Sequence, residues 1–115
     1  MPSLSIRIDL DHGAGRIGPG KIGLLEAIAS AGSISAGARQ MKMSYKRAWD
    51  LVEEVNRILG APVLSTKSGG KSGGGAELTP AGAELIRRFR AIEDSATAAA
   101  TEHLEAIARS IASPS

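Results

Sequence analysis

Polar and apolar residues alternate strictly near the start of the chain. The apolar positions are Leu4, Ile6, Ile8 and Leu10, and they are separated by Ser5, Arg7 and Asp9. This two-residue period is typical of a strand with one buried face, so we predict a strand over residues 3–10. Residues 11–15 are rich in turn formers, after which Arg16 and Ile17 can return as a short partner strand.

Three segments then show the helical period, and we predict helices over about 19–31, 33–41 and 44–59. Their expected inward faces are Ile22, Leu25, Ile28 and Ala29 in the first, Ile34, Ala38 and Met41 in the second, and Ala48, Val52, Val55 and Leu59 in the third. Ser33 and Ser44 are expected N-caps, and Gly32 and Gly60 are expected helix ends. Gly37 lies inside the second helix at a cost of about 1 kcal/mol relative to alanine, which favours a role in close helix packing.

The segment 62–78 predicts a β-hairpin with an unusual tip. Strand-like residues 62–66 and 76–79 flank residues 67–75, of which five are glycine. Since ordering glycine costs the most backbone entropy, we expect these nine residues to form a loop rather than a packed element. Such a hairpin placed after a helix-turn-helix is typical of a wing.

The last helix is predicted to be much longer than the others. Thr79 is a good N-cap and Pro80 a good first residue, and no strong breaker follows before Pro114. About 33 residues would span about 50 Å. Its continuous apolar stripe predicts a homodimer built on a helix over 79–113, with contacts from Leu85, Phe89, Ile92, Ala96, Leu104 and Ile107. The alternative is a helix folded back as two shorter ones, near residues 94–95 or 101.

These elements predict a mainly α fold with a small β component. Residues 1–78 would form a winged helix-turn-helix, and residues 79–113 would form the dimerisation helix. The 115 residues suffice for one domain, and aromatic residues make up only 3% of them. The chain has no cysteine and no long apolar run, which indicates a cytoplasmic protein outside the membrane.

Positive charge is concentrated in the middle of the chain. Residues 33–75 carry seven basic and three acidic side chains, whereas the net charge of the whole chain is only +2. Because a surface that binds DNA must neutralise phosphates, this distribution favours duplex DNA as the partner. The candidate contacts are Ser33 and Ser35 in the second helix, Ser44, Tyr45, Lys46 and Arg47 at the start of the third, and Lys67 and Lys71 in the wing.

Each type of side chain in this set has a chemical reason to bind DNA. Arg47 can donate two hydrogen bonds to guanine, and Lys46 can bind guanine or phosphate. Hydroxyls of Ser44 and Tyr45 suit phosphate oxygens, although Ser44 could serve only as an N-cap and Tyr45 could only pack on the second helix. Trp49 is expected in the core, because it lies one turn into a packed helix.

Other chemistry finds little support in the sequence. The Gly-Lys-Ser of residues 70–72 does not make a nucleotide-binding loop, because Ser65 stands where that motif needs glycine and no helix follows. His12 and His103 have no spaced ligand partners, and no serine lies in a nucleophile motif. We therefore expect neither an enzyme nor a cofactor or metal site.

The motifs carry a family resemblance. Ser33-Ile34-Ser35, the block from Met43 to Asp50, and the glycine-rich wing ending in Leu78-Thr79 resemble the N-terminal DNA-binding domain of the ModE family of molybdate-responsive bacterial regulators. Leu78-Thr79-Pro80-Ala81-Gly82 is similar, more distantly, to LysR-type winged helix-turn-helix domains. The resemblance implies that the third helix reads operator DNA, that the wing contacts the adjacent groove and that the long helix dimerises.

The expected function is therefore sequence-specific regulation of transcription by a homodimer on a pseudo-palindromic operator, in genes of molybdenum metabolism. Members of the ModE family carry C-terminal molybdate-binding domains, and the chain ends at Ser115. We thus expect a DNA-binding half that lacks its own molybdate domain and does not bind molybdate directly. Three explanations stay open, namely that the effector domain is supplied by another chain, that it was never present, or that the sequence is truncated. The alternative is a winged-helix module that binds proteins or dimerises without reading DNA.

Overall fold

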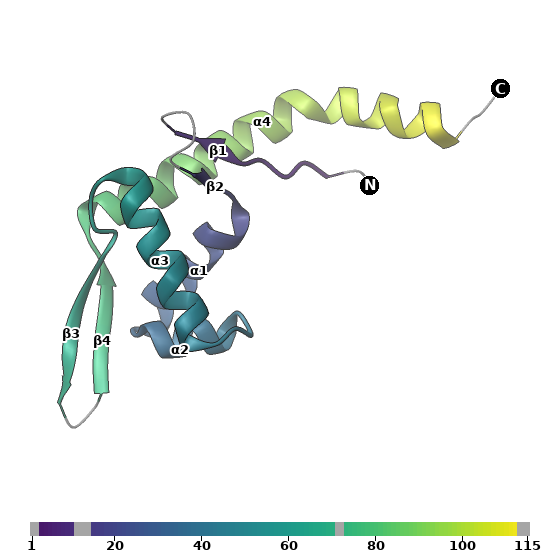
Figure 1. Cartoon of the computed structure of the whole chain (residues 1–115). Coiled ribbons are helices and arrows are strands. Elements are labelled where there is room, and N and C mark those ends of the chain that lie inside the picture. Colours follow the sequence, from purple (N-terminus) through teal and green to yellow (C-terminus); the bar gives the residue numbers. More distant parts are fainter. Residues whose placement is uncertain (1–2, 11–14, 71–72, 113–115) are drawn as a thin grey trace.

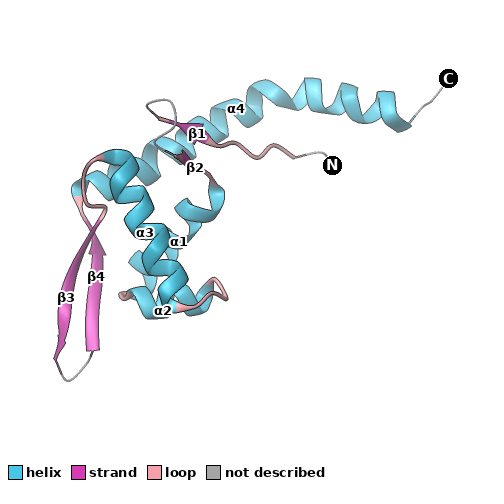
Figure 2. Cartoon of the chain, viewed as in Figure 1, coloured by secondary structure: helices cyan, strands magenta, loops and turns pink. Residues whose placement is uncertain are grey.

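The computed structural model describes residues 3–10, 15–70 and 73–112 (Figure 1). Four helices and two small antiparallel sheets follow one another along these residues, as the colours of Figure 2 show. The elements are β1 (Ile8–Asp9), β2 (Arg16–Ile17), α1 (Pro19–Ala31), α2 (Ile34–Gln40), α3 (Tyr45–Leu59), β3 (Leu64–Gly70), β4 (Gly73–Leu78) and α4 (Pro80–Ala112). This confirms the mainly α fold with a small β component.

The first strand is much shorter than predicted. The alternation of burial holds over residues 3–10, with each apolar side chain partly buried and each polar one exposed. However, only Ile8 and Asp9 pair, with Ile17 and Arg16 respectively. The partner strand limits the sheet, because Gly18 and Pro19 follow Ile17 at once and Pro19 starts α1.

Helix α1 lies at the centre of the core. Ile22, Leu24, Leu25 and Ile28 are all at most 1% exposed, whereas Ala29, predicted to face inward, is exposed. The prediction of a single inward face was wrong for this helix, because it is covered by α2, α3, α4 and the β4 strand. A helix surrounded in this way buries more than one stripe.

Helix α2 packs very closely on α1 at Gly37. A Cβ atom added to Gly37 would lie 2.7 Å from Cα and 2.8 Å from N of Ile28, both backbone atoms of α1. This confirms that Gly37 permits close helix packing. The side chain of Ser33 caps α2 by accepting a hydrogen bond from the N–H of Ala36 at 3.1 Å, as its sequence position predicts.

The wing is a longer ladder than expected. Its strands β3 and β4 pair from Leu64 with Leu78 to Gly70 with Gly73, with an irregularity between Lys67 and Gly70. Residues 67–75 were predicted as a loop because of their glycines. Strand pairing uses backbone groups, which glycine also has, so a ladder can extend through such a segment.

Backbone hydrogen bonds attach the wing to the helices. The N–H of Ala76 donates to the carbonyl of Gly32 at 2.8 Å, in the turn between α1 and α2. At the base of the wing, the N–H of Val63 donates to Asn56 Oδ1 of α3 at 2.9 Å, and the N–H of Thr79 closes the hairpin by donating to the carbonyl of Val63 at 3.0 Å. The wing therefore has a defined position beside α2 and α3.

Helix α4 is one continuous helix, so the alternative of two shorter helices is wrong. Thr79 Oγ1 accepts a hydrogen bond from the N–H of Gly82 at 3.1 Å, which confirms Thr79 as the N-cap. The second half of α4 projects beyond the other elements (Figure 1), and the molecule measures 65 × 29 × 21 Å.

The first part of α4 belongs to the domain core. Phe89 is 1% exposed and packs in the main apolar cluster, which Leu85 also contacts. The guanidinium of Arg90 binds Glu26 of α1 at 2.6 and 3.1 Å and Glu93 at 2.7 Å. These carboxylates, Glu26 first, raise the pKa of Arg90, so the ion pair holding α4 to α1 stays charged.

The predicted dimerisation contacts therefore divide into two groups. The prediction that Phe89 contacts a second copy was wrong, because its side chain is buried in the core of its own chain and has no surface left for such a contact. Leu85 is partly buried and packs against the same core. Farther along, Ile92 is 48% and Ile107 57% exposed, and Ala96 and Leu104 are partly exposed.

The Gly37 contact generates a stability prediction. Gly37→Ala should lower the free energy of unfolding by about 1–3 kcal/mol, because the new methyl group must push α2 away from the α1 backbone. Urea denaturation followed by circular dichroism would measure this.

Gly20→Ala is the matched control within α1, since an added Cβ there meets nothing within 4 Å. It should be neutral or stabilising through helix propensity. Equal destabilisation by both substitutions would contradict the close-packing interpretation.

Candidate nucleic-acid interface

Helix α3 begins with a well-formed cap. Ser44 has extended backbone angles, and its hydroxyl accepts a hydrogen bond from the N–H of Arg47 at 3.1 Å. This satisfies one of the N–H groups that a helix start leaves without a partner. The cap fixes where α3 begins, and therefore which side chains its first turn presents.

The helical spacing of 100° per residue divides α3 into four sides. Ala48, Val52, Val55 and Ile58 are buried against the core. Lys46, Asp50, Glu53 and Arg57 form an exposed ridge opposite to them. On one flank of this ridge lie Tyr45 and Trp49, which face the wing; on the other lie Arg47, Leu51 and Glu54.

The ridge carries both signs of charge. Lys46 Nζ binds the carboxylate of Asp50 at 3.0 Å, and the two side chains are 84% and 56% exposed. So exposed a pair adds little stability, and Lys46 can leave it for another partner. In a DNA groove, Lys46 could donate to guanine, and Asp50 or Glu53 could accept from the cytosine amino group.

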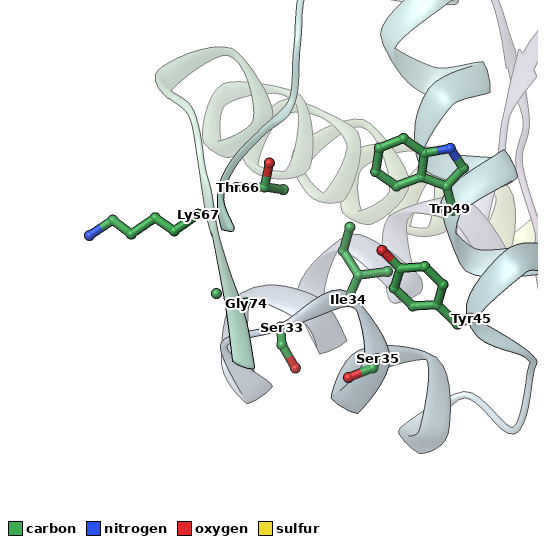
Figure 3. Close-up of a pocket in the computed structure, with 9 residues that line it drawn as sticks. Ser33, Ile34, Ser35, Tyr45, Trp49, Thr66, Lys67 and Gly74 are labelled. Atoms are coloured by element: carbon green, nitrogen blue, oxygen red, sulfur yellow. The ribbon is translucent and has the colours of Figure 1, made fainter. Parts of the chain in front are cut away.

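A cleft of about 620 Å³ separates α3 from the wing. It is lined by residues of α2, α3 and both wing strands, namely Ser33, Ile34, Ser35, Tyr45, Trp49, Thr66, Lys67, Gly74 and Gly75. Figure 3 shows the rings of Tyr45 and Trp49 entering it from α3, opposite Thr66 of β3. The cleft therefore combines aromatic surface with hydroxyl groups.

Trp49 corrects a prediction. It was expected in the core, but it is 40% exposed and lines the cleft. It follows Tyr45, which is 52% exposed, by four residues, so the two rings share one side of α3. That spacing was visible in the sequence, but only the position of the wing shows that this side is open.

The hydroxyl candidates have different roles. The hydroxyl oxygens of Ser33 and Ser44 accept the hydrogen bonds that cap their helices. Each hydroxyl can still donate its own hydrogen to a phosphate oxygen. Ser35 is exposed at the rim of the cleft, with Ser33 beside it (Figure 3). Thr66 is also exposed, but it was not predicted as a DNA contact. The sequence of a short strand does not indicate which of its side chains face the cleft.

The wing candidates are only partly described. Lys67 is exposed, and its side chain extends away from the cleft (Figure 3), where it would reach outward from the wing. Lys71 lies outside the described residues. Arg47 is exposed on the far flank of α3, so the structure does not bring all predicted DNA contacts into one cleft.

The described residues contain neither a cluster of metal ligands nor a membrane-spanning helix. Within residues 3–10, 15–70 and 73–112, no three His, Asp or Glu side chains gather closely enough to hold a metal ion. In the same ranges, none of the helices combines the length and the apolar character needed to cross a bilayer. His12, for which the sequence shows no spaced ligand partner, lies outside these ranges.

Comparison with solved structures supports the fold. A chain in the crystal structure of the CbnR_DBD–DNA complex superposes with a TM-score of 0.59, covering 76% of this chain and 94% of that chain. The two sequences are 23% identical, so the likeness concerns the arrangement of elements.

Several relatives are far more similar in sequence. MopB of Rhodobacter capsulatus, a molybdenum-pterin-binding protein, is 51% identical over 84 residues, which are 73% of this chain and 31% of the relative. The molybdenum transport protein ModE of Azotobacter vinelandii is 38% identical over 88 residues, covering 76% of this chain and 33% of the relative. The ModE of Escherichia coli K12, a DNA-binding transcriptional dual regulator, is 45% identical over 71 residues, covering 62% and 27%.

The chain thus spans about a third of the length of the relatives it matches. The family model of the bacterial regulatory helix-turn-helix protein, lysR family, matches residues 20–83, which run from α1 through the wing into α4. The chain therefore belongs to this lysR family of bacterial regulatory helix-turn-helix proteins, and its helix-turn-helix domain is of the ModE type.

Proposed function

We propose that this chain binds duplex DNA in a sequence-specific manner and regulates transcription as a homodimer. The observation that carries the proposal is the exposed ridge of α3 standing beside a wing that is hydrogen-bonded to the helix-turn-helix. A helix presented in this way can enter a major groove while the wing follows the adjacent backbone. The E. coli relative, named as a DNA-binding transcriptional regulator, supports the same function.

The ridge would supply the contacts to base edges. Lys46 lies in the first turn of α3, the end that enters a major groove most deeply in helix-turn-helix proteins. Asp50 and Glu53 follow on the same ridge. Trp49 and Tyr45 at its edge offer apolar surface for a thymine methyl group and a hydroxyl for phosphate.

The wing side would supply contacts to the DNA backbone. Ser33, Ser35 and Thr66 offer hydroxyls around the cleft, and Lys67 adds a positive charge beyond it. We also propose that Lys71, by its place in the sequence, binds phosphate. Such contacts strengthen binding without selecting a sequence.

The part of α4 from Ile92 onward would form the dimer. Ile92, Ile107 and Ile111 are 48%, 57% and 75% exposed, and they lie on one stripe with Ala96 and Leu104. Covering this stripe with the same stripe of a second copy removes apolar surface from water. A two-fold dimer would place its two α3 helices on half-sites about 34 Å apart or a multiple of that distance.

The names of the relatives support molybdenum metabolism as the field of the regulated genes. We propose a cytoplasmic regulator without catalytic activity, in which this part of the protein binds DNA rather than molybdate. The second candidate remains a protein-binding winged helix that does not read DNA. The dependence of duplex binding on salt separates the two.

The first test is fluorescence anisotropy on two 30-base-pair duplexes, one selected by the protein from a random library and one a scrambled version. Affinity for the selected duplex should fall by a factor on the order of 10³ between about 50 and 200 mM salt, because six or more phosphate contacts release counterions. Lys46→Ala should reduce the preference for the selected duplex by about 1–3 kcal/mol.

Lys67→Ala is the matched control with the same loss of charge. It should weaken both duplexes about equally and lower the salt slope by about 1. If the wild type bound both duplexes equally and without salt dependence, the protein-binding alternative would replace the proposal.

The dimer has its own test, by analytical ultracentrifugation. The Ile92→Glu/Ile107→Glu double variant should remain folded, because both positions are exposed in the single chain. Its dimerisation should weaken at least ~100-fold, since burying unpaired carboxylates costs several kcal/mol. Ala98→Glu, an exposed position on the opposite side of α4, is the control and should leave the dimer intact. A double variant that dimerised like the wild type would rule out this face.

A further inference from the structure

We propose that the flank of α3 facing away from the wing is a second surface for the DNA backbone, formed by Arg7, Arg16 and Arg47. The inference rests on the proposed binding of duplex DNA by α3. It adds residues from the N-terminal hairpin, which lies outside the helix-turn-helix match over residues 20–83.

The surface is a groove of about 520 Å³ beside α3. Its other wall is the β1–β2 hairpin and the start of α1, and its lining includes Arg7, Arg16, Pro19, Lys21, Arg47 and Glu54. Four basic side chains and one acidic side chain thus line the groove. We call it the arginine groove.

The lysine of this groove already has structural partners. Lys21 Nζ binds the Glu54 carboxylate at 2.9 Å and donates to the carbonyl of Arg16 at 2.6 Å, and its side chain is only 18% exposed. Glu54 is therefore neutralised within the protein. Among the described residues that line the groove, Glu54 is the one carboxylate, and it is already paired with Lys21.

The three arginines are available to a ligand. Arg7, Arg16 and Arg47 are all exposed, and within the part of the chain that the structure describes none of them forms an ion pair with a carboxylate. Arginine binds phosphate through two parallel hydrogen bonds, which makes such a group suited to a nucleic-acid backbone.

The fold holds two of these arginines in place. Arg16 precedes Ile17, which is fully buried, and pairs with Asp9 in the β1–β2 ladder. The stem of Arg7 lies across Gly18 at the start of α1, where an added Cβ would come within 2.8 Å of Arg7 Cγ. Their side chains therefore start from an ordered backbone and lose less freedom on binding.

The position of the groove indicates DNA as the partner. A helix in a major groove has one phosphate backbone on each side, and the exposed ridge of α3 lies between the wing cleft and the arginine groove. The polar groups of the wing cleft are mostly neutral hydroxyls, whereas the arginine groove carries three positive charges that can attract a phosphate backbone. Arg47 joins it directly to the first turn of α3.

An acidic protein segment could also be attracted to this groove, whose lining includes the partly buried Met41, Met43 and Leu51. DNA is favoured because one backbone of a duplex held on the α3 ridge must pass this flank. A protein partner would have no such reason to bind beside the ridge.

The test uses the full chain and the same two duplexes. Arg7→Gln/Arg16→Gln should weaken the selected and the scrambled duplex alike, by roughly 10-fold or more at about 150 mM salt, and should lower the salt slope by about 2. The control Arg87→Gln/Arg109→Gln removes two exposed arginines from α4 and should change neither. Circular dichroism would verify that both variants fold.

Each other outcome has a distinct meaning. Salt-dependent binding by the wild type with no change in Arg7→Gln/Arg16→Gln would overturn this inference and leave the proposed function standing. If DNA binding were unchanged in Arg7→Gln/Arg16→Gln but this variant lost the binding of a fluorescent poly-glutamate peptide that the wild type shows, the groove would be assigned to an acidic protein segment instead. A wild type that binds neither duplex would overturn the proposed function itself.

Discussion

The burial of α1 is the constraint on which the rest of the structure depends. The helix is buried on several sides, and three of the elements that cover it are held to it by specific contacts. Gly37 lets the α2 backbone approach Ile28, the carbonyl of Gly32 accepts from the wing, and Glu26 binds Arg90 of α4. A chain with one phenylalanine and one tryptophan, only the first of them buried, needs such close contact between small and aliphatic side chains to fill its core.

The site follows from this packing. With α2 held against α1 and the wing held at Gly32, the described residues leave the ridge of α3 and its two flanks open to solvent. The wing closes one flank into a cleft, and the N-terminal hairpin borders the other. Two distant parts of the chain thus frame one helix, with hydroxyl groups in the wing cleft on one side of the ridge and three exposed arginines in the arginine groove on the other.

Local signals in the sequence predicted much of this correctly. Ser33, Ser44 and Thr79 were identified as N-caps because their chemistry acts within three residues, and the structure shows all three bonds. The errors concern residues whose surroundings come from elsewhere in the chain. Trp49 occupies a half-open side of α3 because the wing stands off from it, and Phe89 is buried because α4 packs on α1 before it projects. Periodicity can place a residue on a stripe, but it cannot tell what covers that stripe.

The sequence by itself therefore determined the order of the elements, their caps, the presence of a wing and the length of α4, since these depend on hydrogen bonds and steric effects between near neighbours. Only the tertiary structure decided which faces remain open. The apolar stripe of α4 is buried in the core at Phe89 and exposed from Ile92 onward, and α3 has a groove on each of two sides. The reason is that exposure depends on where segments far apart in sequence come to lie, and that depends on how closely each can approach α1.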